Sequence, residues 1–333
     1  MKYNEFECTY HFVNRYCKAT GVKQHEKPLE FYNRHLLDIA QNLKEFGDDG
    51  EIIFNQASFE QIWWKIGRPY YRFHPAAAKL FANTRLDVPV KYLKFPSRVF
   101  VINFSENDPS MKLDDKHYVK SVLVYRGLST NIQKNTSTEA FTIYLDIGEI
   151  YSAEINGVTV TLPLLTFRQL FWTLETEDQT LEEIMCKLPV HPSALQGVII
   201  SEEMLIKCYR LIVSMAFLKQ DENPIIIPHV LSKDSDEWHR ADKTRKEQLE
   251  KKAIRVRESE GWLVGHDEMF EMGKIGKAMP GQPSECTGRE HMFARFVTGH
   301  WKLVRYGPQR EFGRVRWIMP YISGEGKPFK HDD

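Results

Sequence analysis

Apolar residues follow a helical spacing at first, an alternating spacing in the middle of the chain and a helical spacing again after residue 163. The first pattern predicts an amphipathic helix over 31–46 and a second helix that begins after Ser58, a suitable N-cap, and ends at Gly67. The aromatic segment 69–75 is interpreted as a connector, with His74 as a capping or packing residue. Residues 31–67 are therefore predicted to be mainly helical.

Alternating apolar and polar residues between 94 and 162 predict β-strands. Asn156-Gly157, between two of these segments, is a strong signal for a two-residue hairpin turn. Consecutive strands with short connections are typical of an antiparallel sheet. The predicted strands are 94–104, 118–125, 140–146, 149–155 and 158–162.

Helical spacing returns after Pro163 and predicts helices over 167–172, 181–188 and 202–219. The helix over 202–219 carries a broad apolar stripe, and Cys208 within it is interpreted as core packing. Residues 232–257 are polar, which is typical of a solvated linker or surface helix; alternatively, their cations extend a basic surface. Residues 274–285 are rich in Gly and Pro and are predicted to form a loop.

These elements predict an α+β fold in which helices flank a central antiparallel sheet and a basic, aromatic β-hairpin follows near the C-terminus. Hydrophobic residues make up 42% of the 333 residues, which is enough for a large core and excludes global disorder. We expect N-terminal helices plus the sheet over 1–165 and a helical segment over 166–231. Residues 232–333 are expected to hold a polar linker and a basic segment packed on the same body.

Cysteine usage and hydropathy indicate a reduced, cytosolic setting. The five cysteines are odd in number and scattered, and none forms a CxxC pair, so neither a disulfide framework nor a thiolate zinc site is indicated. No apolar run reaches the length of a membrane span, and residues 1–12 have no apolar core of a signal peptide. We therefore expect no membrane association.

Positive charge is segregated near the C-terminus. The chain has 45 Lys plus Arg against 45 Asp plus Glu, yet residues 240–330 carry a surplus of seven positive charges, so the rest carries seven negative charges. Between Arg289 and Lys330 there are nine Lys plus Arg against three Asp plus Glu. Such asymmetry indicates a cationic contact surface, but it does not distinguish nucleic acid from an acidic protein as the partner.

The basic segment is also aromatic and alternates like strands over 295–298 and 314–318, with turn residues at Tyr306-Gly307-Pro308. Three interpretations fit the predicted hairpin: a solvated cationic face whose aromatic rings cover the core, a surface that binds phosphate or carboxylate groups, or a metal-independent ribonuclease site. The candidate binding residues are Arg295, His300, Trp301, Arg305, Arg314, Arg316 and Trp317, and the candidate catalytic residues of the ribonuclease alternative are His300, Arg305 and Tyr306.

Several common sequence motifs of enzymes and metal sites are absent. The chain has no Walker A motif, no GxGxxG after a strand, no HExxH, no GxSxG and no EF-hand pattern. His291 and His300 are nine residues apart, which is outside helical ligand spacing. We therefore expect neither a metal site nor a small-molecule cofactor, and a binding protein is favoured over an enzyme.

Four landmarks carry a resemblance to a known family. They are a proline-entered strand at 95–101, an apolar helix at 209–218 with the acidic turn 221–224, the polar stretch that follows, and the C-terminal pair of Gly299-His300-Trp301 and Arg314-Val315-Arg316-Trp317. In this order they resemble phage- and plasmid-encoded proteins whose characterised members are type V-A anti-CRISPR proteins. The chain departs from the family pattern in having Arg295 where a histidine is usual, five residues before His300.

The resemblance implies a function and a partner. It implies suppression of effector-nuclease biogenesis in the host-cell cytoplasm, through recognition of the nascent N-terminal polypeptide on the ribosome and loss of its messenger RNA. It implies no cofactor and no established catalysis. From the residues alone, a mixed body with a cationic and aromatic surface suits an extended peptide through a sheet edge or RNA through stacking and guanidinium contacts.

Overall fold

The structure, a computed structural model, describes residues 59–131, 136–155, 158–172, 178–185, 200–220, 225–229, 240–255, 261–265, 295–297, 299–318 and 321–323. The helix predicted over 31–46 and the loop predicted over 274–285 lie outside these ranges. The helix predicted after Ser58 is confirmed over 59–65, ahead of Gly67, whose φ of 94° suits a residue without a Cβ. No helix in the described ranges is both long enough and apolar enough to cross a membrane.

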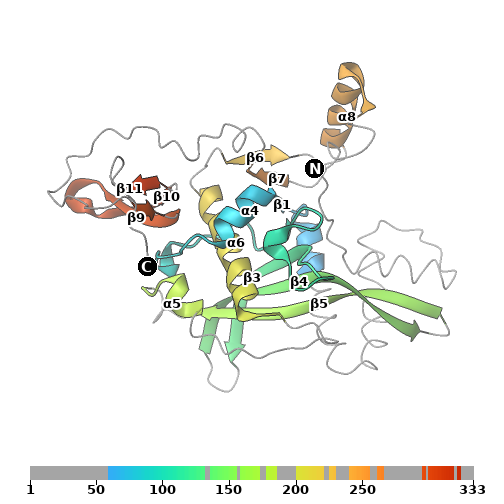
Figure 1. The fold of residues 1–333 in the computed structure, drawn as a ribbon, viewed down its shortest axis with the longest axis horizontal. Helices are drawn as coiled ribbons and strands as arrows, with labels where there is room; N and C mark the ends of the chain where they lie inside the picture. Colours follow the sequence, from blue (N-terminus) through green and yellow to red (C-terminus); the bar gives the residue numbers. More distant parts are fainter. Residues whose placement is uncertain are drawn as a thin grey trace.

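A seven-stranded mixed sheet forms the centre of the molecule (Figure 1), and the predicted α+β class is confirmed. Strands β2 to β5 pair antiparallel with their sequence neighbours, as predicted, whereas β1 pairs parallel with both β2 and β7, and β6 pairs antiparallel with β7. The spatial order is β5-β4-β3-β2-β1-β7-β6. The strands are β1 Tyr70–Phe73, β2 Val99–Asn103, β3 Ser121–Asn131, β4 Thr136–Ile155, β5 Val158–Trp172, β6 Ile226–His229 and β7 Gly261–Val264.

Three local predictions differ from the structure. Residues 167–172, predicted as helix, are the last six residues of β5. Their four apolar positions fit either period, and backbone pairing with β4 (Tyr144↔Phe167) selects the strand. The strands predicted over 140–146 and 149–155 are one strand, β4, with an irregularity between Asp146 and Ile150. The segment 69–75, predicted as a connector, contains the central strand β1.

Other predictions in this region are confirmed. The Asn156-Gly157 hairpin is confirmed by the pairing of Ile155 with Val158 on either side of the turn, although the two turn residues lie outside the described ranges. His74 is a capping residue, because its Nδ1 accepts a hydrogen bond from Ala76 N at 3.2 Å at the start of α4 (Pro75–Ala82).

Two helices, α4 and α6 (Glu202–Gln220), cover one face of the sheet (Figure 1). The predicted helix 202–219 is thereby confirmed. Ser201 accepts a hydrogen bond from Met204 N at its start, and Glu202 and Glu203 complement the helix dipole in its first turn. The other helical elements are α5 Leu181–Met185, α8 Lys243–Arg255, η2 Val90–Tyr92, η3 Pro109–Met111 and η6 Pro308–Arg310.

The core lies on both faces of the sheet. The larger cluster packs α4 and α6 against alternate residues of the strands, among them Tyr71, Phe73 and Phe100. The opposite face holds a smaller cluster in which Trp63 of the helical segment 59–65 packs with Tyr70. Trp63 Nε1 donates to Pro69 O at 2.9 Å, so the indole is held by packing and by a hydrogen bond.

The C-terminal segment forms two small antiparallel pairs. Strands β9 (His300–Tyr306) and β10 (Phe312–Ile318) make a hairpin, and β8 (Arg295–Val297) pairs with β11 (Tyr321–Ser323). The predicted basic hairpin is confirmed, but its first strand is 300–306, not 295–298. The turn between β9 and β10 has left-handed φ values at Gly307 (85°), Gln309 (56°) and Arg310 (57°).

Candidate functional site

The register of the hairpin sorts its residues into two faces. Trp301 lies opposite Trp317 and Leu303 lies opposite Val315, so these side chains share the inner face, which packs on the body. Arg316 lies opposite Lys302 and Phe312 lies opposite Tyr306 on the other face. We call this second set the outer face: His300, Lys302, Val304, Tyr306, Phe312, Arg314, Arg316 and Ile318.

Trp301 anchors the hairpin to α6. Its side chain is 1% exposed, and its Nε1 donates to the Ser214 hydroxyl on α6 at 3.0 Å. The indole also packs on Phe217 and Phe81, with ring centroids 5.2 and 6.4 Å away. A buried indole with a satisfied N–H is a core group, and its ring is not accessible to a ligand at the surface.

Trp317 and Gly313 complete the docking of β10. The Trp317 ring lies 5.0 Å from Phe81, between centroids, so α4 contacts both tryptophans of the hairpin. A Cβ on Gly313 would stand 3.0 Å from Leu303 Cδ1 and 3.2 Å from Tyr92 Cε1. The absence of a side chain at 313 therefore lets the Tyr92 ring approach the β10 backbone closely.

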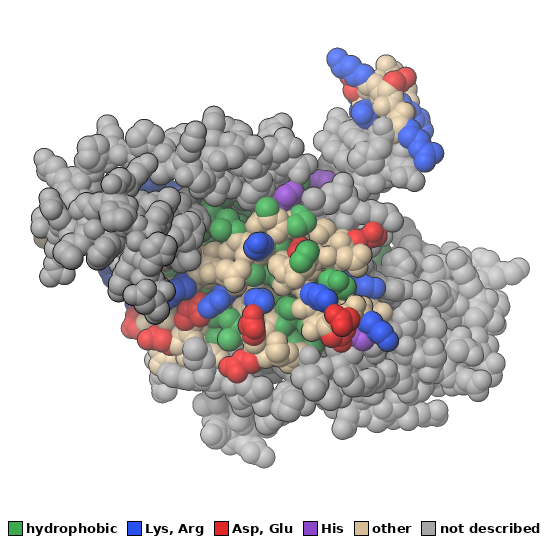
Figure 2. Space-filling view, viewed as in Figure 1, with side chains coloured by type: hydrophobic (Ala, Val, Ile, Leu, Met, Phe, Trp, Pro, Cys, Tyr) green, Lys and Arg blue, Asp and Glu red, His purple; other side chains and the backbone are tan. Residues whose placement is uncertain are grey.

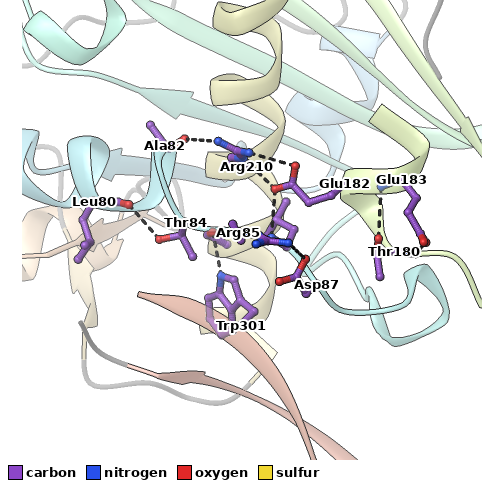
Figure 3. Close-up of polar contacts among 12 residues, drawn as sticks. Leu80, Ala82, Thr84, Arg85, Asp87, Thr180, Glu182, Glu183, Arg210 and Trp301 are labelled. Atoms are coloured by element: carbon purple, nitrogen blue, oxygen red, sulfur yellow. Dashed lines mark hydrogen bonds and ion pairs between the residues drawn. The ribbon is translucent and has the colours of Figure 1, made fainter. Parts of the chain in front are cut away.

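The segment after α4 connects the hairpin to α5 and α6 (Figure 3). Arg85 forms a parallel bridge with His300, and Trp301 N donates to Arg85 O at 3.3 Å. Next to it, the Glu182 carboxylate accepts from Arg210 at 2.9 and 3.0 Å, through Nε and Nη2, and from Leu86 N at 3.2 Å. This bidentate pair ties α5 to α6 at the base of the hairpin.

The outer face combines cations with exposed aromatic rings. Lys302, Arg314 and Arg316 are exposed, and Tyr306 and Phe312 are 52% and 51% exposed. The two rings form a cross-strand pair with centroids 5.7 Å apart and planes inclined at 34°. The Phe312 ring also lies against Gly307, where a Cβ would stand 2.5 Å from Phe312 Cδ2.

A groove separates the hairpin from the body. This cavity of ≈ 590 Å³ runs beside β10, and its lining holds three cations and no carboxylate among the described residues. Gln220, at the end of α6, donates from Nε2 to Lys94 O at 2.7 Å and so fixes one wall. The groove is lined by Lys91, Tyr92, Lys94, Gln220, Gly313, Arg314 and Val315.

Lys91 interacts with two charged residues that do not line the groove, Asp178 and Arg305. Its ammonium donates to the exposed Asp178 carboxylate, and this hydrogen bond is the main cause of the raised pKa of Lys91. The Arg305 guanidinium opposes the rise in that pKa, so Arg305, an inner-face residue next to the turn of the hairpin, lies near the groove. Arg314 belongs to both the groove and the outer face.

The structure brings only some of the sequence-predicted binding residues together. Arg314 and Arg316 share the outer face, and Arg305 lies on the opposite side of the strand pair. Arg295 belongs to β8, in the other two-stranded sheet. Trp301 and Trp317 are docking residues at the inner face rather than surface residues.

The three residues of the ribonuclease alternative do not converge. His300 and Tyr306 stand at the two ends of β9, about 20 Å apart along the strand. Arg305 faces the other side of the hairpin. A shared acid, base and phosphate clamp needs all three groups within hydrogen-bond reach of one phosphate, and this geometry does not provide that.

Most of the groove and part of the outer face are not among the residues predicted from the sequence. Lys91, Tyr92 and Lys94 lie in and after the short helix η2, more than 200 residues before β10. An alternation of Lys and Tyr next to Pro89 was the one signal in the sequence, and it is weak. Lys302 and Phe312 lie within the predicted basic segment. Their place on the outer face follows from the register of β9 and β10, which the sequence does not specify.

Basic character extends to α8 as well. Figure 2 shows Lys and Arg side chains around this helix, which stands apart from the sheet in Figure 1. Its described side chains are mostly exposed, so the surface-helix interpretation of 232–257 is confirmed for this part. Within the described ranges, no group of three His, Cys, Asp or Glu side chains is placed to hold a metal ion.

Comparison with known proteins gives a family. No curated protein matches the chain. Three chains of solved structures match; one is the crystal structure of AcrVA2, which is 12% identical, with a TM-score of 0.47 over 93% of this chain and 91% of that chain. The family described as "AcrVA2-like: Anti-CRISPR type V subtype A2 family" matches residues 71–324, well over half of the sequence. The chain therefore belongs to the AcrVA2-like family of type V-A anti-CRISPR proteins.

Proposed function

We propose that this anti-CRISPR protein lowers the expression of an RNA-guided nuclease by binding the nascent polypeptide on the ribosome, in the host-cell cytoplasm. Membership of the family supports a partner in a type V CRISPR system. The groove beside β10 is the observation that supports a polypeptide as the ligand.

The groove runs along β10, as a site for an extended peptide would. Gly313, Arg314 and Val315 are consecutive residues of β10, so the lining follows the strand lengthwise. Among the described strands β10 pairs with β9 alone, which leaves its other edge beside the groove. An extended peptide adds to such an edge through main-chain hydrogen bonds, while its side chains enter the pockets alongside.

The charges of the groove favour a peptide with acidic side chains. Lys91, Lys94 and Arg314 line it, and an ammonium or guanidinium forms charge-assisted hydrogen bonds with carboxylates. Arg305 adds a further positive charge next to Lys91. In this proposal Trp301 and Trp317 hold the hairpin in place and do not touch the ligand. Arg295, which belongs to β8 and not to the groove lining, stays a predicted contact.

A pull-down of ribosome–nascent-chain complexes from translating cells tests the proposal. The groove variant Lys91→Gln/Lys94→Gln removes two charges, and the matched control Lys65→Gln/Lys116→Gln removes two exposed charges elsewhere. We expect the wild type and the control to capture nascent nuclease chains and the groove variant to capture several-fold fewer. Equal capture by a folded groove variant would contradict the proposal.

RNA binding is a second candidate, favoured by the five Lys and Arg against one Glu between residues 300 and 318. The dispersion of His300, Arg305 and Tyr306 favours binding without cleavage. We expect purified protein to leave RNA intact in EDTA, and His300→Ala to change nothing in that assay. Robust cleavage by the wild type that His300→Ala abolishes would establish the ribonuclease instead.

A further inference from the structure

Docking of the hairpin on the body does not explain the aromatic and basic residues of its outer face. The inner face supplies Trp301, Leu303, Val315 and Trp317 to the core, so the hairpin is held without any contribution from Tyr306 or Phe312. Large exposed apolar side chains are rare in the described ranges; they are Ile66, Ile227, Tyr306 and Phe312. Two of these four, Tyr306 and Phe312, are neighbours on the outer face, so their exposed rings form one apolar patch rather than two isolated positions.

The arrangement of the two rings is preorganised. The ring centroids of Tyr306 and Phe312 lie 5.7 Å apart across the strands, and the Phe312 ring packs against Gly307. The buried indole of Trp301 fixes the strand that carries Tyr306. Each ring is about half exposed, so one side of the pair is accessible to a planar partner.

Three cations, Lys302, Arg314 and Arg316, lie on the same face of the hairpin as the two rings. Arg314 and Arg316 are two residues apart on β10 and face the same way, about 7 Å from each other along the strand. Lys302 lies directly opposite Arg316. A row of cations next to exposed aromatic rings on a strand pair is a combination that binds unpaired nucleotides, because phosphates contact the cations and bases stack on the rings.

We propose that the outer face binds single-stranded RNA. Bases stack on Tyr306 and Phe312, and phosphates contact Arg314, Arg316 and Lys302. The inference rests on the second candidate function, RNA binding, and assigns it to this face; it is separate from the first, which places a polypeptide in the groove beside β10. The two sites meet at Arg314, so a message and the polypeptide translated from it are bound next to each other.

RNA accounts for the outer face better than an acidic peptide does. An acidic peptide uses the cations, but its carboxylates offer no aromatic face to stack on the two rings. Every nucleobase has a flat face, and base–aromatic stacking contributes in any sequence context. Substitutions at the rings and at the cations therefore separate the two ligands.

Fluorescence anisotropy of a labelled, unstructured single-stranded RNA of 15 nucleotides tests the inference with the purified full chain. We expect Tyr306→Ala/Phe312→Ala to weaken binding at least tenfold, in the range of one or two lost stacking contacts. Tyr306→Phe keeps the ring and is expected to bind like the wild type. Lys302→Gln/Arg316→Gln is expected to reduce the slope of log affinity against log salt by about 0.7 for each lost phosphate contact.

Two controls make the result specific. Lys65→Gln/Lys116→Gln removes the same number of charges elsewhere and is expected to leave RNA affinity unchanged. The groove variant Lys91→Gln/Lys94→Gln is expected to retain stacking-dependent RNA binding while it loses nascent-chain capture, so failure of one proposal is distinguishable from failure of the other. Thermal midpoints of all variants report folding.

Three results would overturn the inference: no RNA binding by the wild type, RNA binding that the ring substitutions leave unchanged in folded protein, or displacement of RNA by an oligoglutamate peptide as effectively as by unlabelled RNA. The third result would assign the outer face to acidic polypeptides.

Discussion

Removal of the Trp301 indole tests how the hairpin is attached to the body. In Trp301→Ala the ring that packs between Phe81 and Phe217 is lost, and the Ser214 hydroxyl loses its hydrogen-bond partner. Truncation of a buried Trp costs about 3–5 kcal/mol through lost burial and the cavity left behind. Loss of the indole N–H is part of that cost, because a typical hydrogen bond contributes about 1 kcal/mol. We expect the free energy of unfolding to fall by about 4 kcal/mol.

Urea denaturation of the full chain, followed by circular dichroism, measures this loss. Trp301→Phe keeps one aromatic ring but not the donor, so it is expected to lose less than Trp301→Ala does. A double-mutant cycle of Trp301→Phe with Ser214→Ala isolates the hydrogen bond, with a coupling of about 1 kcal/mol. If Trp301→Ala lost less than about 1 kcal/mol, the indole would not be a core group, and its place among the candidate binding residues would be restored.

Three further predictions concern the supports of the site. Glu182→Ala leaves the partly buried Arg210 guanidinium without its carboxylate and is expected to cost about 2 kcal/mol in urea denaturation; no change would show that the pair is a solvated one. Gly313→Val forces Tyr92 away and is expected to cost about 1–3 kcal/mol, with faster proteolysis of the hairpin, and unchanged proteolysis would argue against the docking. Burial raises the pKa of Cys208 to about 12, so we expect iodoacetamide at pH 8 to modify this thiol only after unfolding. Peptide mass spectrometry measures the modification, and rapid modification in folded protein would show that Cys208 is exposed.

Patterns within one element were readable from the sequence. The antiparallel strands β2 to β4, the long helix α6 and the basic hairpin follow from period-two or helical spacing together with turn residues. The last six residues of β5 could not be predicted in this way, because their four apolar positions fit a helix as well as a strand, and only the pairing with β4 decides. The central strand β1 has only four residues, and so short an aromatic segment fits a connector as well as a strand.

Tertiary placement determines the rest of the site. A strand alternates between two faces, but the sequence does not say which face of the hairpin packs on α6, since both carry apolar residues such as Leu303 and Val304. Trp301 therefore entered the candidate binding set, although the structure places it in the core. Lys91 and Lys94 became neighbours of Arg314 only through the docking of the hairpin.

The amount of nuclease in cells tests the central claim that the hairpin surface carries the function. Wild-type protein, Arg314→Glu/Arg316→Glu and the control Lys65→Glu/Lys116→Glu would each be expressed with a type V nuclease, and nuclease protein would be quantified by immunoblot. Exposed charges contribute little to stability, so all three proteins should share nearly the same thermal midpoint. We predict that the wild type and the control lower the nuclease amount and that the Arg314/Arg316 variant spares it. Equal suppression by that folded variant would contradict the account, because the basic hairpin would then be an ordinary solvated face.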